Sequence, residues 1–350
     1  MKTSKIILAL IFAITWCIGC KKDRQVKTDI TTGLHVKDGK YLADKCGNKI
    51  ILNGVNMGSI YAVNFGLKEL EEIEKTGANN VRIVLERSYK DWTNGGAVTA
   101  LTAAKIEPII TSCINKGMIP ILELHDFTGS GNVASDLPKA TQWWLSAGIK
   151  AMLMKYQPSI ILNIANEPDN GAASDATYRD ANLVALKELR NAGYTCPIMI
   201  DAPGWGKDHV FFLYQGKALM DADPLHNLLF SVHAYWPTNG PFGNYSDAKI
   251  TADFTALKQT GLPIVFGELA IADIQNGLAY LINYRLLMKL CKDNEFGYIA
   301  WWWGFNNNVG ANNQLSMTND GLFSGLAGGG KVIAVDDANA IKNVAKRVCP

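Results

Sequence analysis

Eight apolar runs recur along this 350-residue chain, and helical stretches separate most of them from one another. The runs are continuous instead of alternating, which indicates strands covered on both faces, as the strands of a parallel sheet are. They lie at residues 51–57, 80–85, 118–125, 159–167, 197–201, 228–235, 263–268 and 296–303. Eight such units in an α/β chain of this length predict a closed (β/α)₈ TIM barrel.

The segments between the runs carry helix signals. Helical patterns are expected at residues 66–76, 98–116, 140–156, 176–192, 248–260 and 278–293, with a closing helix at 336–347. Four of the stretches end in glycine, the usual helix-stop residue, at Gly77, Gly117, Gly193 and Gly261. Residues 34–43 alternate around a Lys-Asp-Gly-Lys turn and predict a short N-terminal β-hairpin. Because no GxGxxG loop follows the first run, an open dinucleotide-binding sheet is disfavoured.

The chain divides into three parts by composition. Residues 1–20 read as a lipoprotein-type signal peptide, with lysines, an apolar core and a final Gly19-Cys20. Cys20 would then carry a lipid, residues 21–32 form a polar tether, and residues 33–350 form the catalytic domain. An ordinary signal peptide is the alternative. We expect export, with a membrane-anchored protein in the periplasm or on the cell surface if the lipid is present, and secretion otherwise.

Charge and cysteine content exclude several classes. A formal net charge of +2 argues against a nucleic-acid binder, and no later apolar run is long enough to span a bilayer. The remaining cysteines, which are odd in number and form no CxxC pair, make zinc improbable and leave disulfide pairing open: Cys46, Cys113, Cys196, Cys291 and Cys349. No metal and no organic cofactor is expected, and we expect a monomer.

Two of the apolar runs end in glutamate, Glu167 on the fourth and Glu268 on the seventh. In a barrel of this kind the reactive groups collect at the C-terminal ends of the strands, so the two side chains should meet across the mouth. A buried carboxylate is costly unless it is paired or hydrogen-bonded, which makes packing alone a poor explanation. Paired carboxylates suit glycosidic bond cleavage.

The neighbours suggest which glutamate has which role. Asn166 can bind a sugar hydroxyl beside Glu167, which we expect to be the acid/base, kept protonated by apolar surroundings and the opposing charge. Glu268 is then the nucleophile. Arg82, at the end of the second run, can hold it ionised, and Tyr235 can donate a hydrogen bond to it.

Other strand-end residues complete a sugar site. His125 and His233 are candidate substrate-binding residues, although a strand-end histidine can also be only a satisfied rim residue. Trp301 and Trp303 fall on one side of the last strand by alternation, so at least one should form the floor of the sugar site, with barrel packing as the other explanation. Trp205 is a further stacking platform. Weaker candidates are Glu123, Asp126 and Trp236.

The chain resembles glycoside hydrolase family five, in the clan of retaining (β/α)₈ enzymes, from about Gly33 to Arg347. Within the family it is most similar to bacterial endo-β-1,4-mannanases. The motifs that carry the resemblance are Gly54-Val55-Asn56, residues 78–82, 122–126, 163–168, 201–206, His233-Ala234-Tyr235, Gly267-Glu268 and the terminal tryptophans. The resemblance implies Glu167 as acid/base and Glu268 as nucleophile. Around the −1 sugar it implies Arg82, Asn166, His233, Tyr235 and Trp301. Phe127, Leu269-Ala270 and residues 302–305 depart from the family pattern.

These observations favour a retaining, endo-acting hydrolase of β-1,4-mannosidic bonds in mannan or glucomannan, with the polysaccharide as the only partner. Two alternatives stay open. One is another activity of the same family, such as a β-glucanase, cellulase or exo-mannosidase, since loops at the barrel mouth decide chain length and epimer. The other is a carbohydrate-binding lipoprotein that has lost catalysis.

Overall fold

The computed structural model describes residues 32–91, 95–241, 243–304 and 315–349. The expected signal peptide at residues 1–20 and nearly all of the tether lie outside these residues. Eight parallel strands close into a barrel in the order β3-β4-β7-β8-β9-β10-β11-β14, which confirms the predicted fold class. The strands are β3 (Asn53–Met57), β4 (Asn80–Leu85), β7 (Ile119–Leu124), β8 (Ile161–Asn163), β9 (Ile198–Asp201), β10 (Leu228–His233), β11 (Ile264–Leu269) and β14 (Gly297–Trp303).

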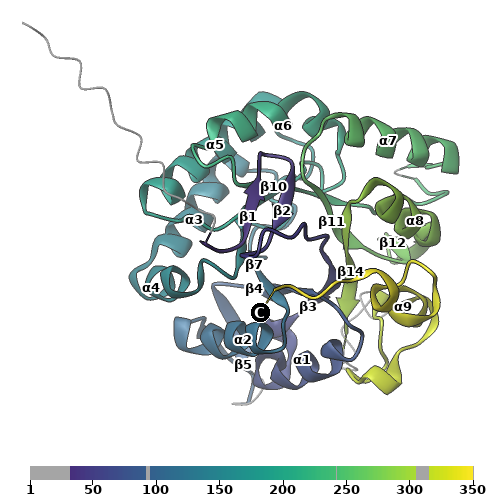
Figure 1. Cartoon of the computed structure of the whole chain (residues 1–350), viewed down its shortest axis with the longest axis horizontal. Helices are drawn as coiled ribbons and strands as arrows, with labels where there is room; N and C mark the ends of the chain where they lie inside the picture. The colour runs from purple at the N-terminus through teal and green to yellow at the C-terminus, as the bar shows by residue number, and fades with distance from the viewer. Residues whose placement is uncertain (1–31, 92–94, 242, 305–314, 350) are drawn as a thin grey trace, which may run out of the picture.

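Helices surround the barrel as an outer ring (Figure 1). They are α1 (Leu67–Glu74), α2 (Ala103–Asn115), α3 (Val133–Leu145), α4 (Ala147–Tyr156), α5 (Asp175–Asn191), α6 (Val210–Ala222), α7 (Asp247–Gln259) and α8 (Tyr284–Asn294), with the short α9 (Gly328–Lys331) and α10 (Ile341–Val344). Gly77, Gly117, Gly193 and Gly261 all adopt positive φ after their helices, as their stop role requires. Helix α6 was not delineated from the sequence.

Four expected helices differ in extent. The stretch 140–156 is two helices, because Ser146 is extended and its hydroxyl bonds the Trp143 carbonyl. Residues 97–100 and 278–281 are strands β6 (Ala97–Ala100) and β13 (Leu278–Leu281), paired with β5 (Ser88–Asp91) and β12 (Ala272–Gln275). Asn276-Gly277 forms the β12–β13 turn, and both residues have positive φ. This dipeptide is a strong hairpin signal that the helical reading overlooked. Of 336–347, only α10 is α-helical.

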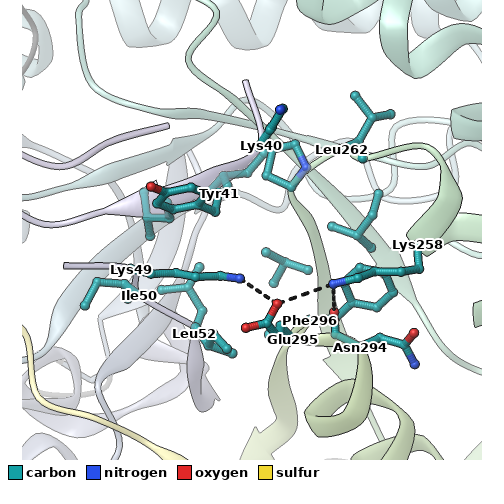
Figure 2. Close-up of a pocket in the computed structure, with 18 residues that line it drawn as sticks. Lys40, Tyr41, Lys49, Ile50, Leu52, Lys258, Leu262, Asn294, Glu295 and Phe296 are labelled. Carbon is teal, nitrogen blue, oxygen red and sulfur yellow. Dashed lines mark hydrogen bonds and ion pairs between the residues drawn. The ribbon is translucent and has the colours of Figure 1, made fainter. Parts of the chain in front are cut away.

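The predicted N-terminal hairpin is present as β1 (His35–Lys37) and β2 (Tyr41–Ala43), and it lies across the end of the barrel (Figure 1). Its contacts are with the segments that precede barrel strands, which identifies this as the N-terminal end. A cavity of about 230 Å³ lies between the hairpin and the barrel. Figure 2 shows Lys49 and Lys258 pointing toward Glu295 there, at 2.8 and 3.5 Å from its Oε2.

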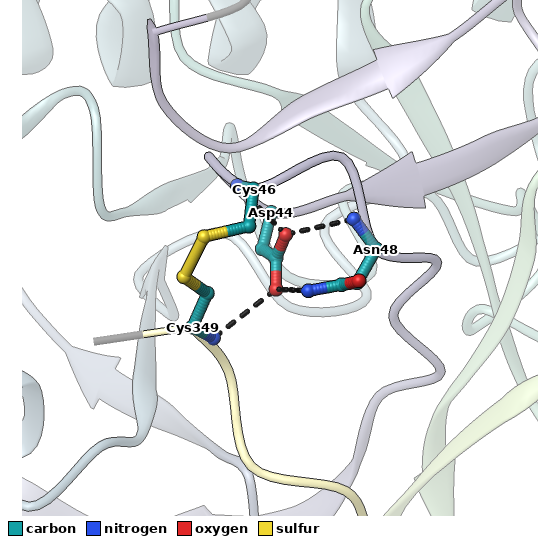
Figure 3. Close-up of a disulfide and its surroundings, with 4 residues drawn as sticks. All are labelled: Asp44, Cys46, Asn48 and Cys349. Atoms are coloured by element: carbon teal, nitrogen blue, oxygen red, sulfur yellow. Dashed lines mark hydrogen bonds between the residues drawn. A yellow bond between two sulfur atoms is a disulfide. The ribbon is translucent and has the colours of Figure 1, made fainter.

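A disulfide between Cys46 and Cys349 joins the segment after the hairpin to the C-terminal segment at the same end of the barrel (Figure 3). Asp44 lies beside it and accepts hydrogen bonds from the backbone N–H groups of Cys46, Asn48 and Cys349. The bridge spans 303 residues and so encloses nearly the whole domain. Cys113, Cys196 and Cys291 are free and buried.

The core is apolar almost throughout, from the barrel interior to the inner faces of the helices. At the C-terminal end of the strands this changes, because Arg82, Glu123, Asp201, His233 and Glu268 are all nearly inaccessible to solvent. Buried charges need partners, so this end is where a functional site is expected. Across the described part of the chain, no helix combines the length and apolarity that a bilayer crossing requires.

Candidate active site

Glu167 and Glu268 face one another at the barrel mouth. One carboxylate oxygen of each, together with a ring nitrogen of His233, lie within 4.8 Å of one another. The register of the sheet is irregular between Ser231 and His233 and between Phe266 and Leu269. Such irregularities re-aim side chains at the rims of barrels, and here they occur in the two strands that carry His233 and Glu268.

Glu268 is held by two donors. The Arg82 guanidinium donates to Oε1 at 3.0 Å, and the Tyr235 hydroxyl donates to Oε2 at 2.6 Å. Burial raises the pKa of the Glu268 carboxyl and the Glu167 carboxylate raises it further, while His233, Arg82 and Tyr235 act in the opposite direction. The nearby Glu167 carboxylate thus opposes ionisation of Glu268, while the positive charges and the Tyr235 hydroxyl favour it.

Glu167 is the fourth residue after the end of β8, and its backbone has a φ of 40°. Its N–H donates to Asp201 Oδ2 at 3.1 Å, and its carbonyl accepts from the Gly129 N–H at 2.7 Å. A left-handed glutamate persists only where its surroundings enforce it, and such residues cluster at active sites. The strained backbone therefore aims the carboxyl group into the mouth.

His233 is the partner of the Glu167 carboxyl group, with Nδ1 at 2.6 Å from Oε1. Its Nε2 lies 3.6 Å from Asp201 Oδ2. Burial lowers the pKa of His233, but the negative charges of Glu268, Asp201 and Glu167 outweigh this effect and raise the pKa to about 9. At neutral pH the imidazole is therefore protonated, and its Nδ1–H donates to Glu167 Oε1.

Arg82 is the centre of the hydrogen-bonding network, and its side chain is fully buried. Besides Glu268 it donates to Asn56, Asn163 and Asn166 at distances of 2.7 to 3.0 Å. Asn166 in turn donates to the Thr128 hydroxyl at 2.9 Å. One fully buried cation therefore fixes groups from three different strands, β3, β8 and β11.

The parallel rings of His125 and Trp301 form one wall of the site. His125 stacks on Trp301 with ring centroids 5.9 Å apart and an interplanar angle of 8°. His125 Nδ1 lies 2.9 Å from Glu123 Oε1. Burial lowers the pKa of His125, yet the carboxylate of Glu123 raises it on balance. A flat face of this kind beside the carboxyl pair suits a pyranose ring.

These groups open into a cleft of about 950 Å³. Its lining includes both glutamates and the side chains His125, Asn166, Trp205, Tyr235, Tyr245, Lys249 and Trp301. Trp205 is 43% exposed and rests against the backbone of Gly129, where a Cβ would collide with the indole. The volume is larger than one sugar needs, so the cleft can hold several units of a polymer.

The three groups nearest one another, Glu167, His233 and Glu268, also form a possible cation site by distance. Their charges argue against that use. With its pKa raised to about 9, His233 is protonated at neutral pH and has no lone pair for a metal. Arg82 already neutralises Glu268. The residues present fit proton transfer better than metal binding.

Residues 44–307 match the sequence profile of the cellulase family, glycosyl hydrolase family 5. The chain belongs to glycosyl hydrolase family 5. It is therefore a glycoside hydrolase. Among its relatives, the mannan endo-1,4-beta-mannosidase of Cellvibrio japonicus is 30% identical over 322 residues, which are 91% of this chain and 69% of that protein.

Solved structures of the family agree with the fold. The catalytic domain of a mannanase from Streptomyces sp. SirexAA-E matches with a TM-score of 0.77 at 27% identity, over 93% of this chain and 96% of that one. A β-mannanase from Streptomyces thermolilacinus with mannohexaose matches with a TM-score of 0.75 at 28% identity, over 90% and 97% of the two chains.

Most predicted site residues of this family 5 chain line the cleft, whereas Arg82 and His233 are buried behind it and contact the two glutamates. Trp303 is the exception and corrects the expectation from alternation. Its side chain is completely buried in the core, and its indole N–H donates to the Gly321 carbonyl at 2.9 Å. The sheet register shifts between Ala300 and Trp303, which breaks the two-residue period, so Trp301 alone of this pair faces the cleft. Trp236, a weaker candidate, is also fully buried.

Sequence reasoning missed Asp201 and Asn163 as members of the site. Both are buried, and they contact Arg82 and one another. A signal was present, because Asp201 is the last residue of the fifth apolar run and Asn163 lies at the centre of the fourth. Polar side chains in such runs need partners, and the partners lie on other strands.

Proposed function

We propose that this protein is an endo-β-1,4-mannanase that hydrolyses mannan or glucomannan with retention of anomeric configuration. The observation that carries the proposal is the proximity of the two carboxyl groups, with one oxygen of each within 4.8 Å. Retaining glycosidases separate their carboxyl groups by about 5–5.5 Å, whereas inverting enzymes need about 6.5–9.5 Å for an intervening water.

In the first step Glu268 attacks the anomeric carbon and forms a glycosyl ester while the glycosidic C–O bond breaks. The departing oxygen takes the proton that Glu167 delivers from the Glu167–His233 pair. In the second step water attacks the same carbon, its proton passes to Glu167, and the bond to Glu268 breaks, which regenerates the carboxylate. The first step removes one proton from the enzyme and the second returns one, so the full cycle leaves its proton content unchanged.

The contacts of the two glutamates support this division of roles. Arg82 and Tyr235 donate to Glu268 and stabilise a carboxylate there. Glu167 has neither donor, and its Oε1 lies 2.6 Å from Nδ1 of His233 instead. Asn166, held by Arg82 and Thr128, is oriented to bind a hydroxyl of the −1 sugar, with His125 and Trp301 as the stacking wall.

The choice of mannan is supported by the relatives, whose names specify mannan as substrate, and by the mannohexaose complex of the Streptomyces thermolilacinus enzyme. A second candidate is hydrolysis of β-1,4-glucan, favoured by the cellulase description of the family profile. An internal cleavage mode is supported by the extended cleft of about 950 Å³.

The test is incubation with mannan, glucomannan, cellulose and an aryl β-mannoside, with product lengths and the anomeric proton signal followed over time. We expect mannan and glucomannan to yield mixed oligosaccharides, with the β-anomer appearing first. Initial release of the α-anomer would exclude retention. Cleavage of cellulose but not of mannan would favour the second candidate. Release of mannose as the sole product would indicate an exo mode. Tight binding of the polysaccharide without any product would favour the non-catalytic alternative.

We further propose that the protein is exported and monomeric, with Cys20 as the site of a lipid. A disulfide between Cys46 and Cys349 supports an oxidising compartment. Replacing Cys20 with alanine should move the protein from the membrane fraction to the soluble fraction of the producing cell, which cell fractionation measures. An unchanged distribution would contradict lipid anchoring and leave an ordinary signal peptide.

A further inference from the structure

Asp201 is the last residue of β9. Its side chain contacts the backbone of Glu167 directly and lies beside His233, which contacts the Glu167 carboxyl group. Its Oδ2 accepts the backbone N–H of Glu167 at 3.1 Å. The same oxygen lies 3.6 Å from Nε2 of His233, whose Nδ1 contacts the Glu167 carboxyl group at 2.6 Å. One carboxylate thus faces the strained backbone of Glu167 and the ring that contacts its side chain.

Asp201 is itself firmly held. Its Oδ1 accepts from Asn163 Nδ2 at 3.1 Å, and Arg82 lies 3.4 Å from Oδ2. The backbone carbonyl accepts from the Tyr178 hydroxyl at 2.8 Å. Asp201 is only 1% exposed and is absent from the cleft lining. It therefore touches no substrate, and any effect on the reaction must pass through its neighbours.

We propose that Asp201 is a positioning residue for proton donation by Glu167. It holds the left-handed backbone at position 167 and keeps His233 turned so that Nδ1 meets the Glu167 carboxyl group. This proposal rests on the proposed function, because it presupposes Glu167 as the acid. The charged and titratable groups that face Asp201 are Arg82, His233, Glu167 and Tyr178.

The variant Asp201→Asn separates this role from a structural one. Asn163 and the Glu167 N–H donate to different oxygens of Asp201. In the variant an NH₂ group replaces one of these oxygens, so one of the two hydrogen bonds is lost. The measurement is kcat/KM, which reports the first step, for two aryl β-mannobiosides. One has 2,4-dinitrophenol as leaving group, which departs without a proton, and the other has phenol, which needs one.

We expect kcat/KM for the phenyl substrate to fall by about 10- to 100-fold, part of the 10²–10⁴-fold that general acids contribute. For the dinitrophenyl substrate it should stay within about threefold of the unmodified protein. Equal losses for both substrates, or no loss for either, would overturn the proposal. If Asp201→Asn does not fold, Tyr178→Phe decides by the same criterion, because it removes the hydroxyl that holds the Asp201 backbone carbonyl and leaves the contacts of Arg82 unchanged.

Two control variants distinguish a failure of this proposal from a failure of the proposed function. In Glu167→Ala, kcat/KM should fall strongly for the phenyl substrate and only slightly for the dinitrophenyl substrate. If it does not, the role of Glu167 in the proposed function fails, whatever Asp201 does. Asp223→Asn is a matched change at a buried aspartate paired with Arg190, at the other end of the barrel. It should affect both substrates equally, through stability alone.

Discussion

Two buried arginines hold opposite ends of this barrel, and they do so with different partners. Arg82, at the mouth, contacts side chains on several strands, which are Asn56, Asn163, Asn166, Asp201 and Glu268. Arg190, at the N-terminal end, binds Asp223 through two parallel hydrogen bonds and also three backbone carbonyls, those of Tyr194, Cys196 and Asn227.

This difference shows that Arg82 belongs to a reactive site, whereas Arg190 has a structural role. Backbone carbonyls are present whatever the sequence, so Arg190 ties loops together and leaves no reactive group exposed to a ligand. Arg82 instead collects carboxylates and amides whose charge and hydrogen-bonding capacity chemistry can use. The following predictions test whether this division between the two ends holds.

The largest effect is expected for Glu268→Gln. Loss of the attacking oxygen should lower kcat on mannan by a factor on the order of 10⁵ or more, the scale found when a nucleophile is removed. Far-ultraviolet circular dichroism should stay unchanged. The matched variant Glu295→Gln, at the opposite end, should keep full activity. Substantial turnover by Glu268→Gln would remove the nucleophile assignment.

Arg82→Met and Arg190→Met should both lower the free energy of unfolding, by about 3–5 kcal/mol, because each leaves a buried carboxylate unpaired. Only Arg82→Met should also lose activity at temperatures where it is folded. Urea denaturation measures the first effect and mannan hydrolysis the second. A fully active Arg82→Met would show that the network at the mouth is structural, like the one around Arg190.

Removal of the Cys46–Cys349 disulfide should lower the free energy of unfolding by about 2–4 kcal/mol and leave kcat/KM unchanged. The bridge lies at the N-terminal end of the barrel, whereas the cleft lies at the C-terminal ends of the strands. The double variant Cys46→Ser with Cys349→Ser, compared with the oxidised protein in thermal denaturation, makes the measurement. A changed kcat/KM would mean that the two ends are coupled.

The pH dependence of stability should report His233. Its folded pKa is raised to about 9 from an unfolded value near 6.5, so its ion pairs stabilise the fold fully below about pH 6.5. That contribution should fade as the pH rises toward about 9. Urea denaturation of the protein and of His233→Asn between these limits measures the difference. If the free energies of unfolding of the two proteins changed in parallel with pH, the assignment of a charged His233 would be contradicted.

The smallest effect is expected at the pocket of Figure 2. Lys49→Ala should change the free energy of unfolding by less than about 1 kcal/mol, because the Lys49–Glu295 pair is substantially exposed to solvent. Activity should not change. A loss of activity in a mannan assay would show that the N-terminal end influences the site.

Much of the barrel was predictable because each strand had local evidence. Continuous apolar runs and glycine stops marked where strands and helices began and ended, and a chain of such units has few ways to close. The β12–β13 hairpin was predictable too, through Asn276-Gly277, and was lost to a helical reading of the residues that follow. The break at Ser146 had no comparable signal, since serine is common within helices and at their ends.

The sequence by itself determined that Glu167 and Glu268 lie at strand ends and hence share one rim, because the parallel strands of a closed barrel all end on the same side. Arg82 lies within β4 and reaches that rim through its side chain. Only the tertiary structure decided the rest. The Cys46–Cys349 pairing, the burial of Trp303 and the contact of Asp201 with Glu167 depend on register shifts and through-space distances between strands far apart in sequence. Local patterns carry no information about such distances, because each is set by the packing of the whole barrel.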